Sequence, residues 1–337
     1  MRFRAGIAID LGTVNTLVWV LGRGLVVEEP SAIALDVTTG AVAAVGHEAD
    51  MLAGKDAQDV QVVFPLQDGV VADLEATAAM LHAFLRRALP HRGLLRPSAL
   101  VCVPGGATWV ERRAVIAATE ARRPRCSVRL VDEPVAAAAG AGADLAGGAG
   151  AFVVDIGGGT TEVAVVTGAR VARSRSLRLA GNAMDDAIVS AAKTELGLIL
   201  GRNAARRLKS TLGLTGGASG WAEAVGIDAA RRTPRTEKVP GTLVASALEP
   251  AVRAITEAVD DMLADIPPDL AEEVVQGKIL LTGGGSLLPG LPTRIETIAG
   301  IGTLLADDPL RCVARGAADI LERGVTVGTV TQPGSAA

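Results

Sequence analysis

Two segments of the sequence carry the same residues suited to phosphate chemistry. In each segment an apolar run ends in an aspartate, and a glycine turn with hydroxyl side chains follows it. The first copy reads GIAIDLGTVNT over residues 6–16, and the second reads AFVVDIGGGTT over residues 151–161. One such turn is weak evidence, because Asp and Gly are common in ordinary turns. The repeat of the whole pattern, with Asp10 and Asp155 145 residues apart, predicts a protein of two similar lobes.

Both turns have the composition of a phosphate-binding loop. Glycine has no side chain, so backbone N–H groups can approach phosphate oxygens closely, and neighbouring hydroxyl and amide groups add donors. The residues predicted to bind phosphate are Gly12, Thr13, Val14, Asn15, Gly157, Gly158, Gly159, Thr160 and Thr161. A triphosphate also needs a divalent cation, and Mg²⁺ keeps several of its waters when it binds. Asp10 and Asp155 are therefore predicted to hold Mg²⁺ through water from opposite sides.

A third glycine turn follows another apolar run in the segment LTGGGSLLPGL, residues 281–291. A turn without side chains can accept a flat base against its backbone. The predicted base-binding residues are Gly283, Gly284, Gly285 and Ser286. An ordinary strand-to-helix loop explains this segment equally well when it is taken alone. Together with the other two turns, it predicts one nucleotide cleft between the lobes.

Strands and helices alternate around these turns, which is typical of an α/β protein. Short apolar and β-branched runs predict strands at 31–35, 41–45, 99–103, 128–131 and 278–281. Apolar residues at helical spacing predict helices at 73–89, 108–121, 184–196, 204–212, 246–266 and 310–323. The stretch from Gly213 to Gly241 is the least regular and is predicted to form a small surface subdomain.

The duplication divides the chain into two predicted lobes and a tail. The first lobe covers residues 1–145, with a small subdomain at about 31–70. The second lobe covers 146–323, with a small subdomain at about 200–245. Residues 324–337 are expected to form a C-terminal tail, because chain ends are often poorly ordered.

Composition argues against several other classes of protein. Aromatic residues make up 2% of the chain, with no Tyr, which fits an α/β sheet protein better than a nucleic-acid binder that stacks bases on rings. The net charge of -4 argues against general affinity for nucleic acid. Three dispersed cysteines give neither a disulfide framework nor a zinc motif, and a reducing cytosol is expected. No signal peptide and no membrane-spanning run are recognised.

Six segments resemble, in order, the motifs of the MreB and Mbl family within the actin and sugar-kinase superfamily. They run from residue 5 to about residue 322 and read IDLGTVNT, VCVPGGATWVERRAV, VDEPVAAAAGAG, VVDIGGGTTEVAVV, LTGGGSLLPGL and DDPLRCVARGAA. The resemblance implies an actin-like (ribonuclease H-like) duplicated two-lobe ATPase fold with ATP and Mg²⁺ between the lobes. It also implies a homopolymer of paired filaments that guides cell-wall synthesis and cell shape with membrane-anchored partner proteins.

The resemblance assigns a catalytic role to two acids. Glu133 matches the family's catalytic glutamate, which would position the attacking water, and Asp155 joins it as a catalytic and magnesium-organising acid. A carboxylate near the γ-phosphate can orient a water and accept its proton. Without the family, the better explanation of Glu133 is an acid at a helix N-terminus, where the helix dipole favours negative charge.

Two segments depart from the family pattern. The family's AGDEMD segment reads AGNAMD here, residues 180–185, which removes two acids from a loop expected near the cleft. Where the family carries a Glu-Glu-hydrophobic-Lys segment that holds the ribose, this chain reads Arg206-Arg207-Leu208-Lys209. A guanidinium cannot accept a hydrogen bond from a ribose hydroxyl. Arg206 and Lys209 stay in the predicted nucleotide site, and we expect a slow ATPase. Two alternatives remain, a nucleotide-binding scaffold with little or no hydrolysis and a small-molecule kinase of the same superfamily.

The family also binds membranes through a short apolar loop, which corresponds here to residues 92–97. Leu94 and Leu95 lie in that loop beside two arginines. Adjacent leucines could insert at a bilayer surface while the cations contact anionic headgroups, although they could equally pack beneath the loop. The expected location is therefore cytoplasmic, peripheral at the inner face of the cell membrane.

Overall fold

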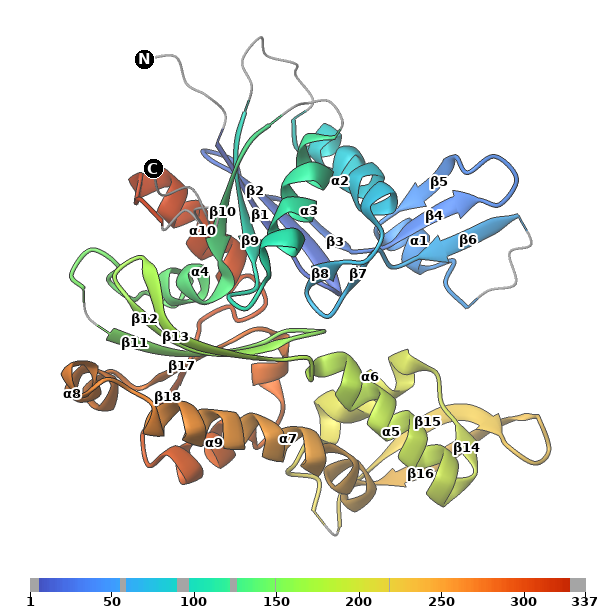
Figure 1. The fold of residues 1–337 in the computed structure, drawn as a ribbon. Coiled ribbons are helices and arrows are strands. Elements are labelled where there is room, and N and C mark those ends of the chain that lie inside the picture. Colours follow the sequence, from blue (N-terminus) through green and yellow to red (C-terminus); the bar gives the residue numbers. More distant parts are fainter. Residues whose placement is uncertain are drawn as a thin grey trace.

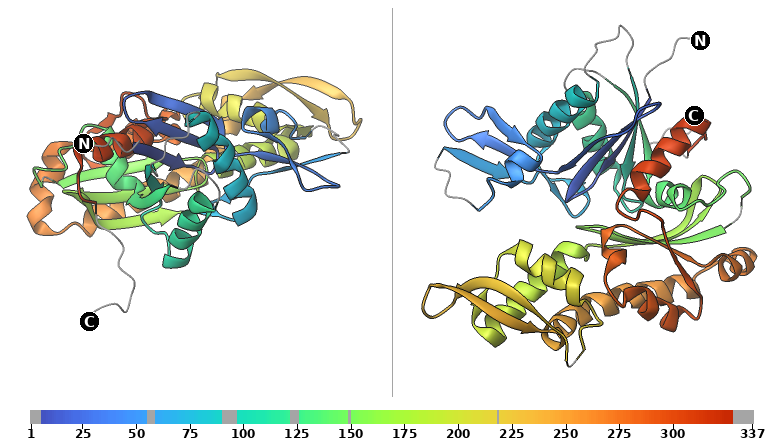
Figure 2. Two further views of the ribbon diagram at one scale, coloured as in Figure 1. Left: turned by 90° about the horizontal axis from the view of Figure 1, so that it is seen from above. Right: turned by 180° about the vertical axis from the view of Figure 1, so that it is seen from behind.

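The protein is described by a computed structural model that covers residues 6–54, 59–89, 97–121, 126–148, 150–217 and 219–327. Two five-stranded sheets, each with helices on its faces, form an upper and a lower lobe in Figure 1. Each lobe extends on the same side of the molecule into a smaller part with its own short sheet, and Figure 2 shows both extensions from behind.

The first sheet has the strand order β10-β9-β1-β2-β3. Its strands are β1 (Gly6–Leu11), β2 (Asn15–Val20), β3 (Gly24–Pro30), β9 (Ser98–Val103) and β10 (Ser127–Asp132). The hairpin strands β1, β2 and β3 pair antiparallel, whereas β1, β9 and β10 pair parallel. Because side chains alternate between the faces of a strand, Ile7 and Ile9 pack on one side and Ala8 on the other.

The second sheet repeats this arrangement with the order β13-β12-β11-β17-β18. Its strands are β11 (Gly150–Ile156), β12 (Thr161–Thr167), β13 (Arg170–Leu177), β17 (Ile279–Thr282) and β18 (Thr303–Leu305). Here too three strands pair antiparallel, and β11, β17 and β18 pair parallel. The shared order and directions confirm the two similar lobes predicted from the repeated turns.

Helices cover the outer face of each sheet. In the first lobe these are α2 (Leu74–Ala88) and α3 (Trp109–Glu120), and in the second they are α5 (Gly181–Leu196), α7 (Gly241–Ala264), α8 (Pro268–Gly277) and α9 (Leu291–Ala299). Local caps fix two helix starts. Asp73 accepts a hydrogen bond from the N–H of Ala76, and Thr108 and Glu111 form a reciprocal capping box. No helix of the described residues is long and apolar enough to cross a bilayer.

The small sheets lie at the far ends of the lobes. The first consists of β5-β4-β6, with β4 at Ile33–Asp36, β5 at Val42–Val45 and β6 at Val60–Val63, beside α1 (His47–Asp50). The second consists of β14-β15-β16, with β14 at Leu198–Ile199, β15 at Trp221–Asp228 and β16 at Pro234–Pro240, beside α6 (Arg202–Leu212). The region predicted to be least regular, 213–241, therefore contains a regular hairpin, whose outward face is polar enough to hide the strand pattern.

Two helices pack between the sheets, α4 (Glu133–Gly140) and α10 (Cys312–Arg323), as Figure 1 shows beside the upper sheet. Helix α4 contacts both sheets, whereas α10 contacts α4 and strands β1, β2 and β9 of the first sheet. A side chain on Gly140 would overlap the carbonyl of Cys312, and one on Gly316 would overlap the carbonyl of Ala136. The two backbones are therefore in direct contact. Helix α10 lies in the predicted second lobe by sequence, since that lobe starts after residue 145, but it packs on the sheet of the first lobe. The exact division of the chain into lobes stays a prediction.

A short hairpin completes the first lobe. It consists of β7 (Leu66–Gln67) and β8 (Val70–Val71), joined by Asp68 and Gly69. Both turn residues have positive φ, 48° at Asp68 and 77° at Gly69, as a two-residue hairpin turn requires. The tip of this hairpin lies beside the first glycine turn, because the Gly69 N–H donates to the Thr13 hydroxyl at 2.8 Å.

Candidate functional site

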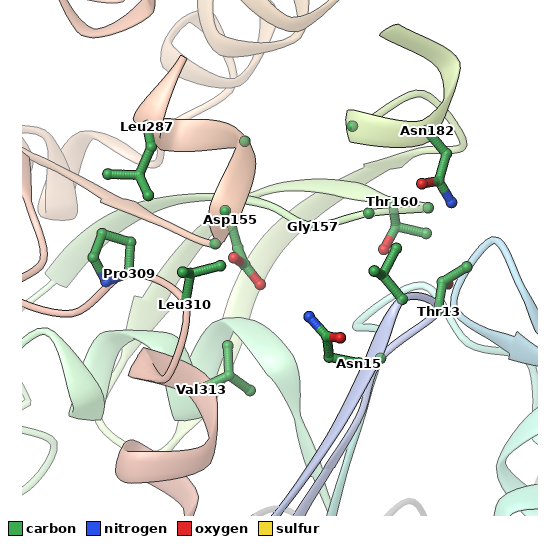
Figure 3. Close-up of a pocket in the computed structure, with 18 of the residues that line it drawn as sticks. Thr13, Asn15, Asp155, Gly157, Thr160, Asn182, Leu287, Pro309, Leu310 and Val313 are labelled. Atoms are coloured by element: carbon green, nitrogen blue, oxygen red, sulfur yellow. The ribbon is translucent and has the colours of Figure 1, made fainter. Parts of the chain in front are cut away.

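A cavity of about 560 Å³ lies between the lobes, and all three glycine turns line it. Figure 3 shows Asp155 and Asn15 reaching into it from opposite sides. The sequence-predicted residues that line the cavity are Asp10, Gly12, Thr13, Val14, Asn15, Glu133, Asp155, Gly157, Gly158, Gly159, Thr160, Arg206, Lys209, Gly283, Gly284 and Gly285. The structure thus gathers residues from both halves of the chain around one space.

The two Asp-Gly turns have the same local geometry. The Gly12 N–H donates to the carbonyl of Asn15 at 3.1 Å, and the Gly157 N–H donates to the carbonyl of Thr160 at 2.9 Å. Each bond closes the turn that joins the first two strands of its sheet. The strand register also repeats, because Asp10 faces Leu17 and Asp155 faces Glu162 across the hairpins.

The glycines of the second turn are needed where the lobes meet. A side chain on Gly158 would overlap the side chain of Val14, and one on Gly159 would come within 2.6 Å of the Thr13 hydroxyl oxygen. Any larger residue would therefore push the two turns apart. Their close approach lets backbone N–H groups of both lobes point toward one bound group.

The third glycine turn forms the opposite end of the cavity. Gly283 has φ +75°, and a side chain there would overlap the carboxylate of Asp155 and the carbonyl of Ile156. The short 3₁₀ helix η1 (Gly284–Leu287) follows it. The apolar residues Leu287, Leu288, Pro309, Leu310 and Val313 line this end, and Figure 3 shows several of them around it. An apolar slot with exposed glycine backbone suits a flat aromatic ring.

Three acids lie close together at the floor of the cavity. Burial first, and the nearby Asp155 second, together raise the pKa of Asp10 to about 7. Burial raises the pKa of Asp155 to about 6, although the Thr282 hydroxyl donates to it at 2.9 Å and opposes the rise. Burial, followed by repulsion from neighbouring carboxylates, holds the pKa of Glu133 well above its usual range. An added cation would relieve this repulsion.

The acids fit a cation that keeps its water shell. Among the residues that the structure describes, no group of three or more His, Cys, Asp or Glu side chains could ligate a metal directly. Asp10 and Asp155 instead approach the cavity from the two lobes, which is the arrangement that water-mediated binding of Mg²⁺ needs. The residues present therefore fit a hydrated magnesium ion.

The wall formed by α5 and α6 carries an ion-pair network around the buried Asp185. Lys209 lies 2.7 Å from Asp185, between Nζ and Oδ1, and also donates to the carbonyl of Gly181 at 2.7 Å. The Nε of Arg206 donates to Oδ2 of the same Asp185 at 3.3 Å. Asp185 is 1% exposed, so it needs these cations to be stable as a carboxylate. Burial lowers the pKa of Lys209 despite this partner.

Two predicted residues do not line the cavity. The hydroxyl of Ser286 is buried and donates to the carbonyl of Gly283 at 2.6 Å, so it holds the turn. The hydroxyl of Thr161 is buried and donates to the carbonyl of Leu179 at 2.7 Å. Both hydroxyls therefore donate to backbone carbonyls within the fold and not into the cavity. Leu94 and Leu95 lie outside the described residues.

Several lining residues have no binding role assigned from the sequence. Gly69 at the tip of the β7–β8 hairpin, Asn182 at the start of α5, and Asp185 one turn later all line the cavity. Asn182 and Asp185 belong to the segment 180–185, for which the sequence indicates only a position near the cleft. The Asp68-Gly69 pair is a hairpin signal that could have been recognised, but nothing local indicates that its tip reaches the Thr13 turn. The partner of Lys209 likewise depends on how two helices pack.

The chemistry of the cavity is that of a site for a phosphorylated aromatic compound. Backbone N–H groups and hydroxyls of the two turns suit a phosphate chain, and paired acids suit a hydrated divalent cation. Glu133, 9% exposed and facing the same space, could contact a water at the end of that chain. The apolar end suits a base.

Comparisons with known sequences identify the family of the chain. The sequence profile of the family described as MreB/Mbl protein matches residues 4–328. The cell shape-determining protein MreB of Escherichia coli (strain K12) is 39% identical over 328 residues, covering 95% of this chain and 94% of that protein. The cell shape-determining protein Mbl of Bacillus subtilis (strain 168) is 37% identical over 323 residues, covering 95% and 96%.

Solved structures show the same fold. MreB5 of Spiroplasma citri bound to ADP superposes with a TM-score of 0.87 at 31% identity, covering 95% of this chain and 97% of that one. A MamK double helical filament superposes with a TM-score of 0.80 at 23% identity, covering 95% and 99%, and supports the fold alone. The predicted actin-like two-lobe fold is confirmed.

Proposed function

The chain belongs to the MreB/Mbl family, and from this premise we propose that it is an ATP-binding bacterial actin homologue whose filaments organise cell-wall synthesis and cell shape. The observation that carries the proposal is the pair of Asp-Gly turns, one from each lobe, which brings Asp10 and Asp155 to one cavity. Relatives with the same fold are described as bound to ADP and to AMPPNP.

In this proposal each part of the cavity binds one part of the nucleotide. The turns at Gly12 and at Gly157–Gly159 bind the phosphates, and Asp10 and Asp155 hold Mg²⁺ through water. Bound Mg²⁺ supplies charge neutralisation for the phosphate chain. The Gly283–Gly285 turn and its apolar neighbours bind the base. Arg206 and Lys209, held by Asp185, face the sugar.

Glu133 is proposed to orient the water that attacks the γ-phosphate. It stands at the first turn of α4, facing the cavity beside Asp10 and Asp155. One observation favours the second candidate function, a nucleotide-binding scaffold with little hydrolysis. The pKa of Glu133 is raised by burial and by neighbouring acids, and a protonated carboxyl cannot accept a proton from water. Mg²⁺ beside these acids would lower that pKa again.

The experiment measures ATP binding, filament formation and phosphate release on the purified chain. We expect binding of a fluorescent ATP analogue in Mg²⁺, filaments by electron microscopy, and slow phosphate release. Glu133→Gln should keep binding and lower the release rate by at least about tenfold. The matched control is Glu75→Gln, an exposed acid on α2. Absence of nucleotide binding contradicts the proposed function, and equal release rates in wild type and Glu133→Gln support the scaffold.

Membrane attachment through residues 92–97 remains a separate proposal. The double change Leu94→Ser and Leu95→Ser should abolish sedimentation with anionic liposomes while nucleotide binding stays at the wild-type level. Sedimentation that persists in this variant assigns membrane binding, if it occurs, to another part of the chain. The measurement also tests the expected location at the inner membrane face.

A further inference from the structure

A buried glutamate outside the cavity lining connects the two lobes. Glu162 lies on β12 of the second lobe, directly across the hairpin from Asp155, and is 2% exposed. Its two carboxylate oxygens accept the N–H of Gly105 at 3.0 Å and 2.9 Å. Gly105 follows β9 and belongs to the first lobe. One carboxylate therefore bridges the lobes directly after the second phosphate turn.

The turn that Glu162 binds is closely packed on both sides. We call residues Pro104, Gly105 and Gly106 the bridging turn. A side chain on Gly106 would lie 3.3 Å from Ser176 of the second lobe, and one on Gly105 would lie 3.6 Å from Pro134. The bridging turn thus lies between β12–β13 and the start of α4. The N–H of Gly105 in this turn donates to the Glu162 carboxylate.

A buried arginine links the bridging turn to the catalytic helix. The guanidinium of Arg112 donates to the carbonyls of Pro104, Gly105 and Ala107 at 3.5, 3.4 and 3.1 Å. The same guanidinium donates to Asp132 at 2.5 Å. Arg112 is 7% exposed, so these bonds are shielded from water. Asp132 precedes Glu133 directly and is the N-cap position of α4.

These contacts form one continuous path across the lobes. It begins at Glu162 in the second lobe, passes through the bridging turn and Arg112 in the first lobe, and ends at Asp132 beside Glu133. Glu162 also lies near enough to Glu133 for its charge to be the largest neighbouring contribution that raises the pKa of Glu133. Movement of the second lobe relative to the bridging turn would therefore displace Asp132 and the first turn of α4.

We propose that Glu162 is a positioning residue for ATP hydrolysis, which holds the bridging turn against the second lobe and so fixes Glu133 only when the lobes are closed. This inference rests on the proposed function. When Gly105 leaves Glu162, the bridging turn and Arg112 lose their anchor on the second lobe. The water-orienting carboxylate then loses its fixed place relative to the phosphate turns, which belong in part to that lobe. Reaction geometry is sensitive to displacements of about 1 Å.

The test separates positioning from binding. In the purified chain with Mg²⁺ and ATP, Glu162→Ala should lower kcat for phosphate release by about ten- to a hundredfold. The dissociation constant of a fluorescent ATP analogue should change by less than about threefold, because Glu162 does not line the cavity. Glu162→Gln should recover most of kcat, because its amide oxygen still accepts the Gly105 N–H. The matched control is Glu223→Ala, an exposed acid on β15.

A double variant identifies the route of the effect. If Glu162 acts through Glu133, then Glu162→Ala should cause little further loss in a Glu133→Gln background. A full additional loss overturns the positioning role, and so does a wild-type kcat in Glu162→Ala. If that variant does not fold, Glu162→Asp shortens the side chain by one methylene and should show the same kcat loss. A wild-type kcat in Glu162→Asp would then overturn the proposal.

Failure of the proposed function looks different. If the wild-type chain binds the analogue but releases no phosphate, hydrolysis is refuted and the positioning role falls with it. If wild type releases phosphate at a rate that Glu162→Ala leaves unchanged, only the positioning role is refuted.

Discussion

Replacing Asp10 by asparagine should stabilise the empty protein and abolish its response to nucleotide. The isosteric change removes one of the two charges that face each other across the cavity without altering the side-chain volume much. The pKa of Asp10 is raised from 3.8 to about 7, by burial first and by Asp155 second. A raised carboxyl pKa means that ionisation costs the folded state free energy. That cost is absent below about pH 4, grows as pH rises, and is complete above about pH 7.

The size of the effect follows from this pKa difference. The gap between 3.8 and about 7 is roughly three, and each pKa unit corresponds to about 1.4 kcal/mol, so the upper limit is about 4 kcal/mol. Asp10 faces the cavity and is partly exposed, so water screens part of this cost. We expect Asp10→Asn to raise the free energy of unfolding by about 2 kcal/mol near pH 8, which corresponds to a rise in Tm of several degrees.

The assay is thermal unfolding of nucleotide-free protein in a metal chelator, at about pH 8 and about pH 5. Asp10→Asn should have the higher Tm at the upper pH, with a smaller difference at the lower pH. Adding Mg²⁺ and ATP should raise the Tm of wild type but not of the variant. Asp260→Asn, at an exposed position on α7, is the control for the substitution itself. A lower Tm than wild type at about pH 8 would refute the electrostatic reasoning.

Three further changes test the packing and the ion pairs. Gly316→Ala should cost at least about 3 kcal/mol in chemical denaturation, because the new methyl group would overlap the carbonyl of Ala136. Lys209→Met should lower unfolding free energy by about 2 kcal/mol and weaken binding of the ATP analogue, since Asp185 would keep one cation instead of two. Asp73→Ala should cost about 1 kcal/mol by removing the cap of α2, without changing nucleotide binding.

The duplication and the floor of the cavity could be predicted from the sequence because their signals are local. An apolar strand, an aspartate and a glycine turn occupy about ten consecutive residues, and hairpin geometry then determines where the aspartate points. The equivalent hydrogen bonds that close the two turns, donated by the N–H groups of Gly12 and Gly157, follow from this local sequence pattern. To predict that Asp10 and Asp155 both line the cavity, one needs only the further assumption that the two copies of the motif face each other.

The rest depended on packing between distant segments. Ser286 has the composition of a ligand donor, yet its hydroxyl is used by the Gly283 carbonyl. Asp185 is unremarkable in sequence and becomes important only because α6 places Lys209 beside it. The bond between Gly105 and Glu162 joins residues from different lobes, and no periodicity or motif indicates which turn will meet which strand.

The contact of α4 with α10 limits how the two helices can shift against each other. Backbone meets backbone at two points, Gly140 against Cys312 and Gly316 against Ala136, so sliding along the helices would bring carbonyl groups into overlap. Glu133 lies seven residues from Gly140 along α4, which at about 1.5 Å per residue makes a lever of about 10 Å. A rotation of α4 by about 5° about this contact would move the Glu133 carboxylate by about 1 Å, a displacement large enough to matter for its proposed role in orienting a water.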